Sequence, residues 1–348
     1  MTAITAVLPE PRTDADRPSR RRRSTPRRLD APGRRPGPWW RRGPVPAALG
    51  LLTALALGGH RLVPDLGLGL GRLWESALPW SGLVLAPVLL CAALRRAPAA
   101  ACAGGVLALV WAVVFGPGLL SGGTAGAVGT AGAAGVGGLT VVTHNVNAAN
   151  GDPAGTARAL LAAGPDLVAL EEVTDAALPA YRGVLDTALP HYARTGTVAL
   201  WSRYPVAESR RLVIDPGWNR SLRAEVSAPG GPLAVYVAHL ASVRTTLGGF
   251  ATAHRDRDIA ALATALDGEP LRRVLLLGDL NTASGDRALA PLTDRLTRAA
   301  TGFGFSWPAA FPVVRIDHIL TRGLSATDTW TLPATRSDHR PVAARLTG

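Results

Sequence analysis

The stretch Arg336-Ser-Asp-His-Arg-Pro-Val342 lies near the C-terminus, directly before an apolar run from Val342 to Leu346 that predicts a closing β-strand. At its centre, Asp338–His339 places a carboxylate beside an imidazole at the edge of that strand. Such a pair can hold a metal ion and move a proton at one place. Because Asp-His pairs also arise by chance, the meaning of this one depends on the segments upstream.

Five upstream segments share one layout, a β-like apolar run that ends in polar residues. They are TVVTHNV (140–146), DLVALEEV (166–173), AVYVAHL (234–240), VLLLGDLN (274–281) and VVRIDHIL (313–320). Core packing alone does not require Asn, Glu, His or Asp at the end of each run. The repeated pattern therefore indicates a polar site.

Residues 139–348 alternate strand-like and helix-like segments. Helices are expected near 153–163, 175–188, 251–266 and 287–298, and further strands at 197–206 and 221–227. Strands at this density, with helices between them, predict a layered α/β architecture with sheets inside and helices outside. A region of this size can bury a core without a disulfide, and both cysteines of the chain, Cys91 and Cys102, lie outside it.

The formal net charge of +12 is unevenly distributed. Residues 1–44 contain twelve arginines against four acidic residues, whereas residues 139–348 contain 21 arginines against 19 acidic residues. A protein that binds duplex DNA through its phosphates usually carries a basic excess on the binding domain. The C-terminal region lacks that excess.

The first 138 residues divide into three segments of different composition. Residues 1–44 are rich in Arg, Pro and Ser and predict a disordered cytoplasmic tail that faces the membrane. Residues 45–120 are apolar and predict three transmembrane helices, at about 45–60, 76–94 and 99–120. Residues 121–138, mostly Gly and Ala without charge, predict a flexible linker.

The charges of the loops predict the orientation in the membrane. The tail and the Arg95–Arg96 turn are basic, which places both in the cytoplasm by the positive-inside rule. Three crossings then put residues 139–348 on the extracellular side. The first span is short for a bilayer, and without it this domain would lie in the cytoplasm. A soluble helical domain is the alternative for the whole apolar region.

The polar strand ends supply the groups that phosphate-ester hydrolysis requires: ligands for a hard cation, a base for water, and donors for the phosphoryl oxygens. Three residues with carboxylate or amide oxygens are the candidate ligands of Mg²⁺, or of Mn²⁺ in its place: Glu172, Asp338 and Asn145. The candidates for water activation are Asp279 and His339, and the carboxylate of Asp317 is the candidate that orients the imidazole. The candidate donors to the phosphate are Asn281 and His239.

The motifs HNVN, LEEV, LWSRYP, VAHL, GDLN, RIDHI and SDHRPV occur in this order along residues 139–348. In these motifs the region resembles the endonuclease/exonuclease/phosphatase superfamily of metal-dependent phosphoesterases. The resemblance implies a four-layered α/β sandwich, two packed β-sheets flanked by helices. It also implies that the eight candidate residues named above form the catalytic and metal site. One departure is Glu171, which stands where the family often has Gln.

The order of basic tail, three spans and external domain is similar to that of the VanJ-type membrane phosphatases, which are linked to glycopeptide-antibiotic resistance. This similarity rests on architecture more than on motifs. It implies hydrolysis of a phosphate or pyrophosphate ester at the outer membrane face, with a lipid-linked substrate such as undecaprenyl pyrophosphate. The expected partners are the bilayer and this substrate, with no obligate protein partner.

Two other functions compete with the phosphatase interpretation. A membrane-tethered surface nuclease, acting as endonuclease or exonuclease, would use the same site, but it requires a basic groove that a net charge of +2 does not suggest. A non-catalytic binding or sensor protein would keep the fold alone, and the complete set of polar site residues argues against it. The sequence therefore favours a metal-dependent hydrolase of phosphoric ester or phosphoanhydride bonds.

Overall fold

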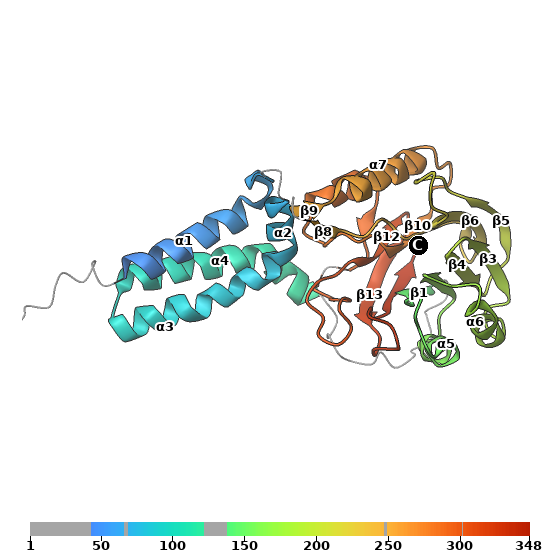
Figure 1. Ribbon diagram of the computed structural model, residues 1–348, viewed down its shortest axis with the longest axis horizontal. Helices are drawn as coiled ribbons and strands as arrows, with labels where there is room; N and C mark the ends of the chain where they lie inside the picture. The colour runs from blue at the N-terminus through green and yellow to red at the C-terminus, as the bar shows by residue number, and fades with distance from the viewer. Residues whose placement is uncertain (1–42, 66–68, 122–137, 247–248, 301) are drawn as a thin grey trace, which may run out of the picture.

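A computed structural model describes residues 43–65, 69–121, 138–246, 249–300 and 302–348. The molecule has two parts, a bundle of apolar helices that projects to one side and a larger part built around β-sheets (Figure 1). The predicted tail at 1–44 and the predicted linker at 121–138 fall outside the described residues, apart from their last or first positions.

The β-rich part contains two six-stranded sheets. The spatial order in the first sheet is β13 (Ser325–Thr331), β14 (Val342–Thr347), β1 (Leu139–Asn145), β2 (Leu167–Glu171), β4 (Val198–Ser202) and β3 (His191–Thr195). The order in the second is β11 (Thr297–Arg298), β12 (Asp317–Arg322), β10 (Val274–Asp279), β7 (Gly231–Ala238), β6 (Ser221–Ala228) and β5 (Val206–Arg211). A separate ribbon pairs β8 (Arg244–Thr246) with β9 (Gly249–Ala251).

Alternate residues of the central strands face two different cores. On β1, Val141 packs between the two sheets, whereas Val142 packs under the helices on the outer face. On β10, Leu275 and Leu277 face the inner core, and Leu276 faces the outer one. Because both faces of these strands are buried, their sequences are continuous apolar runs rather than alternating patterns.

Helices cover the outer face of each sheet (Figure 1). Helices α5 (Pro153–Leu161) and α6 (Leu178–Leu185) lie on the first sheet, and α7 (Ala253–Asp267) and the short α8 (Ala290–Thr293) lie on the second. Helix α5 begins where the side chain of Asp152 accepts a hydrogen bond from the backbone N–H of Gly155 at 2.8 Å. Two packed sheets with flanking helices agree with the predicted α/β sandwich.

Three predicted elements are wrong in extent. The strand expected at 197–206 is two strands, since β4 ends at Ser202 and β5 begins at Val206. The helix expected near 287–298 is a 3₁₀ turn, η4 (Arg287–Leu289), followed by α8, which ends at Thr293 because residues 297–298 pair with β12 as a strand. The strand expected at 313–320 begins at Asp317, since Val314 instead forms an isolated bridge with Trp307.

The apolar part consists of α1 (Pro44–Gly58), η2 (His60–Leu62), α2 (Leu70–Ala77), η3 (Leu78–Val84), α3 (Leu85–Arg95) and α4 (Pro98–Ser121). Two helical runs among the described residues are long and apolar enough to cross a membrane, Leu70–Arg95 and Pro98–Leu119. Helix α1 has 15 residues, about 22 Å at 1.5 Å per residue, which is less than the roughly 30 Å of a hydrocarbon core. The prediction of three full spans is corrected to two, with α1 as a shorter apolar helix.

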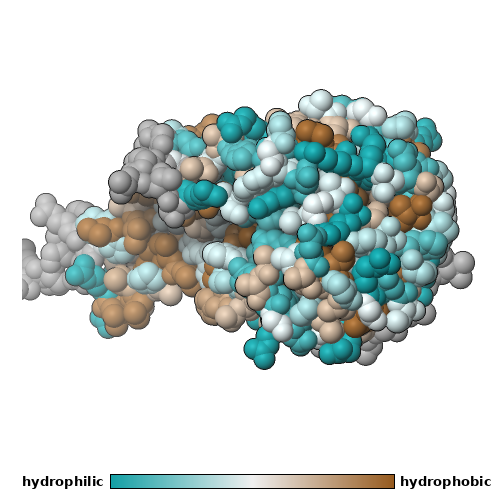
Figure 2. Space-filling view, turned by 45° about the vertical axis from the view of Figure 1, so that its right-hand side comes forward, coloured by the Kyte–Doolittle hydropathy of each residue, from teal (hydrophilic) through white to brown (hydrophobic). Residues whose placement is uncertain are grey.

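Glycine and alanine contacts fix the directions of the bundle helices. Contacts advance in the same direction along α1 and α4: Gly43, the N-terminal cap of α1, lies against Ala97, Gly50 against Ala103, and Gly58 against Val110. Helix α1 therefore runs parallel to α4. Gly104 of α4 lies against Leu89, and Trp111 against Gly82, so α3 runs antiparallel to α4. Large exposed apolar side chains concentrate on this bundle, as the brown surface in Figure 2 shows.

Polar contacts join the bundle to the β-rich part. The carboxylate of Glu75 on α2 is buried and accepts from Arg287 twice, from Nε at 2.7 Å and from the backbone N–H at 2.9 Å. Two further contacts cross the same junction: Arg72 to Asp256 at 2.9 Å and the indole N–H of Trp80 to the carbonyl of Val313 at 2.8 Å. The β-rich part is therefore seated on one end of the bundle.

A second buried ion pair lies on the outer face of the second sheet. The carboxylate of Glu269 accepts from Arg223 at 3.1 Å through both oxygens and from the hydroxyl of Tyr236 at 2.7 Å. Burial alone would raise the pKa of Glu269, but the hydrogen bonds from Arg223 and Tyr236 hold it below its ordinary value of 4.5.

We expect Glu269→Gln to lower the melting temperature of the detergent-solubilised protein by several degrees at neutral pH, since hydrogen bonds to a charged group contribute about 1.5–3 kcal/mol. Because the folded-state pKa is depressed, this contribution is complete above pH 4.5 and disappears as the pH falls through the lower folded value. Melting curves from pH 3 to 8 measure the difference, with Asp294→Asn as an exposed control. A difference that does not change with pH would contradict this account.

Candidate active site

The two sheets bring polar strand ends to one edge. Strands β1 and β2 are parallel and β14 is antiparallel to β1, so the end of β1 lies beside the end of β2 and the start of β14. Strands β7 and β10 are likewise parallel and β12 is antiparallel to β10, which places Asp279 opposite Asp317. The topology therefore brings the polar ends of β1, β2, β7 and β10 to the same edge as the polar starts of β12 and β14.

Four side chains from different strand ends meet at the centre of this edge. The side-chain N–H₂ of Asn145 donates to Glu172 Oε1 and to Asp279 Oδ2, both at 3.1 Å. His239 Nε2 lies 3.8 Å from the same oxygen of Glu172 and 3.7 Å from that of Asp279. Burial, and then the nearby charge of Arg220, lower the pKa of His239 to about 4, so its imidazole is neutral at neutral pH.

His339 is held by Asp317. Its Nδ1 lies 2.9 Å and 3.1 Å from the two carboxylate oxygens of Asp317, which is fully buried. Burial favours the neutral imidazole, but the negative charge of Asp317 and its hydrogen bond raise the pKa of His339 to about 10. Burial would likewise raise the pKa of Asp317, yet the charge of His339 holds it below its ordinary value. The two residues therefore form a buried ion pair.

Asp279 carries the carboxylate that faces this ion pair. Its Oδ2 lies 3.7 Å from His339 Nε2, beyond direct hydrogen-bonding distance. Burial, and then the negative charge of Asp317, raise the pKa of Asp279 to about 7. A carboxylate with such a pKa can accept a proton near neutral pH, as a general base must.

The backbone is strained where it carries site residues. Four non-glycine residues of the described chain have positive φ, and three of them are Asn147, Glu172 and Asn281, with φ of 62°, 62° and 48°. Non-glycine residues rarely adopt this conformation, and such strain concentrates at functional sites. The Asn281 turn is closed by its own N–H, which donates to Asp279 Oδ1 at 2.9 Å, and by its side chain, which donates to the carbonyl of Leu240.

Gly278 explains the glycine of the GDLN motif. Its φ is +143°, and a Cβ at this position would collide with the backbone carbonyl of Ala238 on β7. Only glycine allows β10 to approach β7 this closely. The residue therefore sets the position of Asp279, which follows it directly.

Asn147 is a site residue that sequence reasoning missed. Its side chain donates to Asp338 Oδ1 at 2.8 Å, and its oxygen accepts from the backbone N–H of Ala149. Asp338 is thereby tied to the loop after β1 although it lies just before β14. The signal was present in the sequence, because Asn147 is the last residue of the HNVN motif.

The surroundings of Glu171 favour its protonated, neutral form. It is fully buried and accepts a hydrogen bond from the hydroxyl of Thr143 at 3.0 Å. Burial, and then the negative charges of Asp317 and Asp279, raise the pKa of Glu171 well above its ordinary value. A protonated Glu has nearly the shape and hydrogen-bonding capacity of Gln, which the resembling family often has here.

The site opens into a cavity of about 670 Å³. Its lining includes seven of the eight predicted site residues: Asn145, Glu172, His239, Asp279, Asn281, Asp338 and His339. The eighth, Asp317, lies behind His339 as its hydrogen-bond partner. The opposite wall belongs to the helical bundle and is formed by Arg72, Leu73, Ser76, Ala77 and Trp80.

The residues of this cavity fit a divalent cation. Glu172, Asp279 and Asp338 supply carboxylates, and Asn145 and Asn281 supply amide oxygens, the hard ligands that Mg²⁺ and Mn²⁺ prefer. Asp279, Asp317 and His339 also place one candidate ligand atom each within 4.8 Å of one another. Because His339 Nδ1 is already bound to Asp317, we assign this trio to proton transfer and keep Glu172, Asp338 and Asn145 as the predicted ligands.

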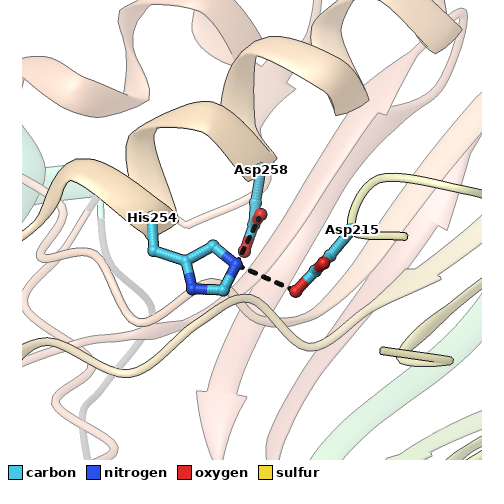
Figure 3. A group of neighbouring side chains, drawn as sticks. All are labelled: Asp215, His254 and Asp258. Carbon is cyan, nitrogen blue, oxygen red and sulfur yellow. Dashed lines mark hydrogen bonds and ion pairs between the residues drawn. The ribbon is translucent and has the colours of Figure 1, made fainter. Parts of the chain in front are cut away.

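A second group of potential ligands lies at the start of α7 (Figure 3). His254 Nε2 is 2.8 Å from Asp215 Oδ2 and 3.7 Å from Asp258 Oδ1, and Asp258 also accepts from the backbone N–H of Ala241. Both carboxylates share a single imidazole nitrogen that is already hydrogen-bonded. The group ties the loop before β6 to α7.

A sequence model of the Endonuclease/Exonuclease/phosphatase family matches residues 142–339, more than half of the chain. The chain therefore belongs to this family, whose members are generally hydrolases of phosphoester bonds. The matched region includes every predicted site residue from Asn145 to His339.

Three individual proteins resemble this chain at low sequence identity. The uncharacterized protein YbhP of Escherichia coli (strain K12) is 31% identical over 166 residues, which cover 42% of this chain and 61% of YbhP. A conserved protein of unknown function from Enterococcus faecalis V583 has a TM-score of 0.52 at 15% identity, covering 60% of this chain and 100% of that structure. Humanized D. rerio TDP2 has a TM-score of 0.51 at 18% identity, covering 61% and 99%. These structural likenesses show the fold alone.

We expect Asp317→Asn to reduce kcat by about 10²–10⁴, because an amide neither stabilises the imidazolium of His339 nor fixes its orientation. KM should change little, since Asp317 does not line the cavity. Hydrolysis of bis(4-nitrophenyl) phosphate by the full-length protein with Mg²⁺ measures the effect, with Asp294→Asn as the control. Retention of full kcat by the folded variant would show that His339 works without this carboxylate.

Proposed function

We propose that this chain is a membrane-anchored, Mg²⁺-dependent phosphoesterase that hydrolyses a phosphate or pyrophosphate ester of a lipid-linked substrate, such as undecaprenyl pyrophosphate. One observation carries the proposal: the cavity that holds the candidate catalytic residues has its other wall on the apolar helices. A substrate with a phosphate head and an apolar tail can place its phosphate among the catalytic residues and its tail against the helices. This activity is also what the similarity to the VanJ-type membrane phosphatases implies.

Each side chain of the site has a separate role in the hydrolytic step. Asp279 accepts a proton from the attacking water, whose oxygen bonds to phosphorus as the bond to the leaving oxygen breaks. The imidazolium of His339, fixed by Asp317, donates toward the developing negative charge. Neutral His239, together with Asn281, donates to the phosphoryl oxygens, and Asn145 holds Glu172 and Asp279 in place.

Glu172, Asp338 and Asn145 would hold the cation. A Mg²⁺ ion held there would offset the negative charge that develops on the phosphoryl oxygens. The contact between Asn147 and Asp338 keeps the latter carboxylate directed to this edge of the sheets. Mn²⁺, which accepts the same oxygen ligands, is the expected substitute.

The directions of the bundle helices support a placement across the membrane. The start of α1 and the Arg95–Arg96 turn lie at one end of the bundle, and the β-rich part lies at the other (Figure 1). Arginines precede α1 in the sequence and form the Arg95–Arg96 turn, and an excess of arginine is typical of cytoplasmic loops. Although α1 is shorter than a full span, its parallel course beside α4 leads from the arginine-flanked end of the bundle to the end that holds the β-rich part, which supports a cytoplasmic N-terminus and an extracellular catalytic part.

Phosphate release from undecaprenyl pyrophosphate and nicking of plasmid DNA, measured in parallel, test the proposal. We expect the detergent-solubilised full-length protein with Mg²⁺ to release phosphate, to lose this activity by 10²-fold or more in His339→Ala, and to lose it on chelation of the metal. Plasmid DNA should stay intact, because the β-rich region carries a net charge of only +2.

DNA nicking that disappears in His339→Ala would overturn the choice of substrate and make the chain a tethered nuclease. If the folded, metal-supplemented protein shows neither activity, the lipid-linked substrate is also wrong. Phosphate release that persists in His339→Ala would instead move the chemistry away from this site.

A further inference from the structure

A second cavity, of about 240 Å³, lies at the junction of the bundle and the β-rich part. It is separate from the candidate active site but adjoins it, since Ser76, Ala283 and Val314 line both. One wall is formed by the last turns of α4, including Phe115 and Leu119. The opposite wall comes from the segment around β11 and its continuation toward β12.

Two arginines face this cavity without acidic partners. Arg298 and Arg315 both line it, and among the described residues neither forms an ion pair with a carboxylate. Arg315 is only 6% exposed, and its Nε donates a hydrogen bond to the carbonyl of Gly304 at 3.0 Å. Glu75, the acidic residue among those that line this cavity, accepts hydrogen bonds from Arg287 through both of its carboxylate oxygens.

The positive charges of Arg298 and Arg315 repel each other. Burial, and then the positive charge of Arg298, lower the pKa of Arg315 to about 10. Burial also lowers the pKa of Arg298, with Arg61 as the second cause. Burial of the Arg315 guanidinium without a carboxylate is unfavourable, and the exposed Arg298 adds a like charge nearby, so an anion bound here would offset both.

The rest of the lining is apolar and aromatic. Phe303 lies 5.5 Å from Phe115 and 5.3 Å from Phe305, measured between ring centroids. Trp111 of α4 extends this row at 5.2 Å from Phe115, so the aromatic rings continue onto the helix that is long enough to cross a membrane. An occupant therefore meets cations at one end and hydrocarbon at the other.

We propose that this cavity binds the phosphate headgroup of an anionic membrane lipid through Arg298 and Arg315, with an acyl chain of that lipid against Phe115 and Phe303. The lipid would act as a bridge between α4 and the segment that carries β11 and leads to β12. The proposal shares the membrane placement with the proposed function but involves no reaction, so the two can fail independently.

Binding of phosphatidylglycerol to the delipidated full-length protein in detergent tests the site, with native mass spectrometry and melting temperature as readouts. We expect one tightly retained phosphatidylglycerol and a higher melting temperature, and at least tenfold weaker retention of phosphatidylcholine with the same acyl chains. Inorganic phosphate and glycerol phosphate at the same concentration should produce no shift, because they lack the apolar part.

Arg298→Gln and Arg315→Gln should each weaken phosphatidylglycerol retention by tenfold or more. Arg298 is the more informative position, because it is exposed and its replacement leaves the buried packing of Arg315 intact. The matched control is Arg295→Gln, three residues away, whose guanidinium pairs with Asp267 and does not line the cavity. This control should retain phosphatidylglycerol as the wild type does.

Three results would overturn the proposal. The first is equal retention of phosphatidylglycerol and phosphatidylcholine, and the second is wild-type retention by folded Arg298→Gln. The third is an equal shift with inorganic phosphate, which would make the cavity a site for a free anion rather than a lipid. None of these readouts depends on turnover, so they stand apart from any loss of hydrolysis.

Discussion

The buried ion pair between Glu75 and Arg287 is the contact on which the arrangement of the two parts depends. Glu75 belongs to the first turns of an otherwise apolar helical run, where an unpaired carboxylate would be costly. Both of its oxygens are satisfied from Arg287, one by the guanidinium and one by the backbone N–H. This pairing fixes α2 against the β-rich part and so determines which residues stand opposite the catalytic edge.

That placement joins two kinds of chemistry in one cavity. On one side are the strand ends, where buried carboxylates and imidazoles take different protonation states because their surroundings differ. On the other side are Leu73, Ala77 and Trp80, which continue into the apolar helices. A soluble phosphate ester needs only the first side. The presence of the second is the structural reason for preferring an amphiphilic substrate.

Much of the site could be predicted from the sequence, because each candidate residue follows or begins an apolar strand. Asp279 and His339 are examples: their strands are buried on both faces, so a polar residue at the end needs another explanation than packing. The uneven distribution of charge is also evident from the sequence, because residues 1–44 carry most of the net charge of +12. The α/β sandwich followed from the density of strands and from the family motifs.

The features of the fold and site that the sequence does not predict depend on contacts between distant segments. The role of Trp80 as a cavity wall, and the pairing of Glu75 with Arg287 across 212 positions, leave no periodic pattern in the sequence. The helix expected near 287–298 was wrong because pairing of β11 with β12 overrides local propensity there. The predicted span at 45–60 is not a full one, because α1 ends at Gly58 and its 15 residues are too short for the hydrocarbon core.

Dependence of kcat/KM on chain length tests most directly whether the bundle forms part of the substrate site. The measurement compares phosphate esters that differ only in their apolar chain, from a short water-soluble group to a long polyprenyl group, on the full-length protein with Mg²⁺. The shared cavity predicts that kcat/KM rises at least tenfold with chain length and that this ratio shrinks in Trp80→Ala. Equal kcat/KM for short and long chains would contradict it, because the apolar wall would then play no part in binding.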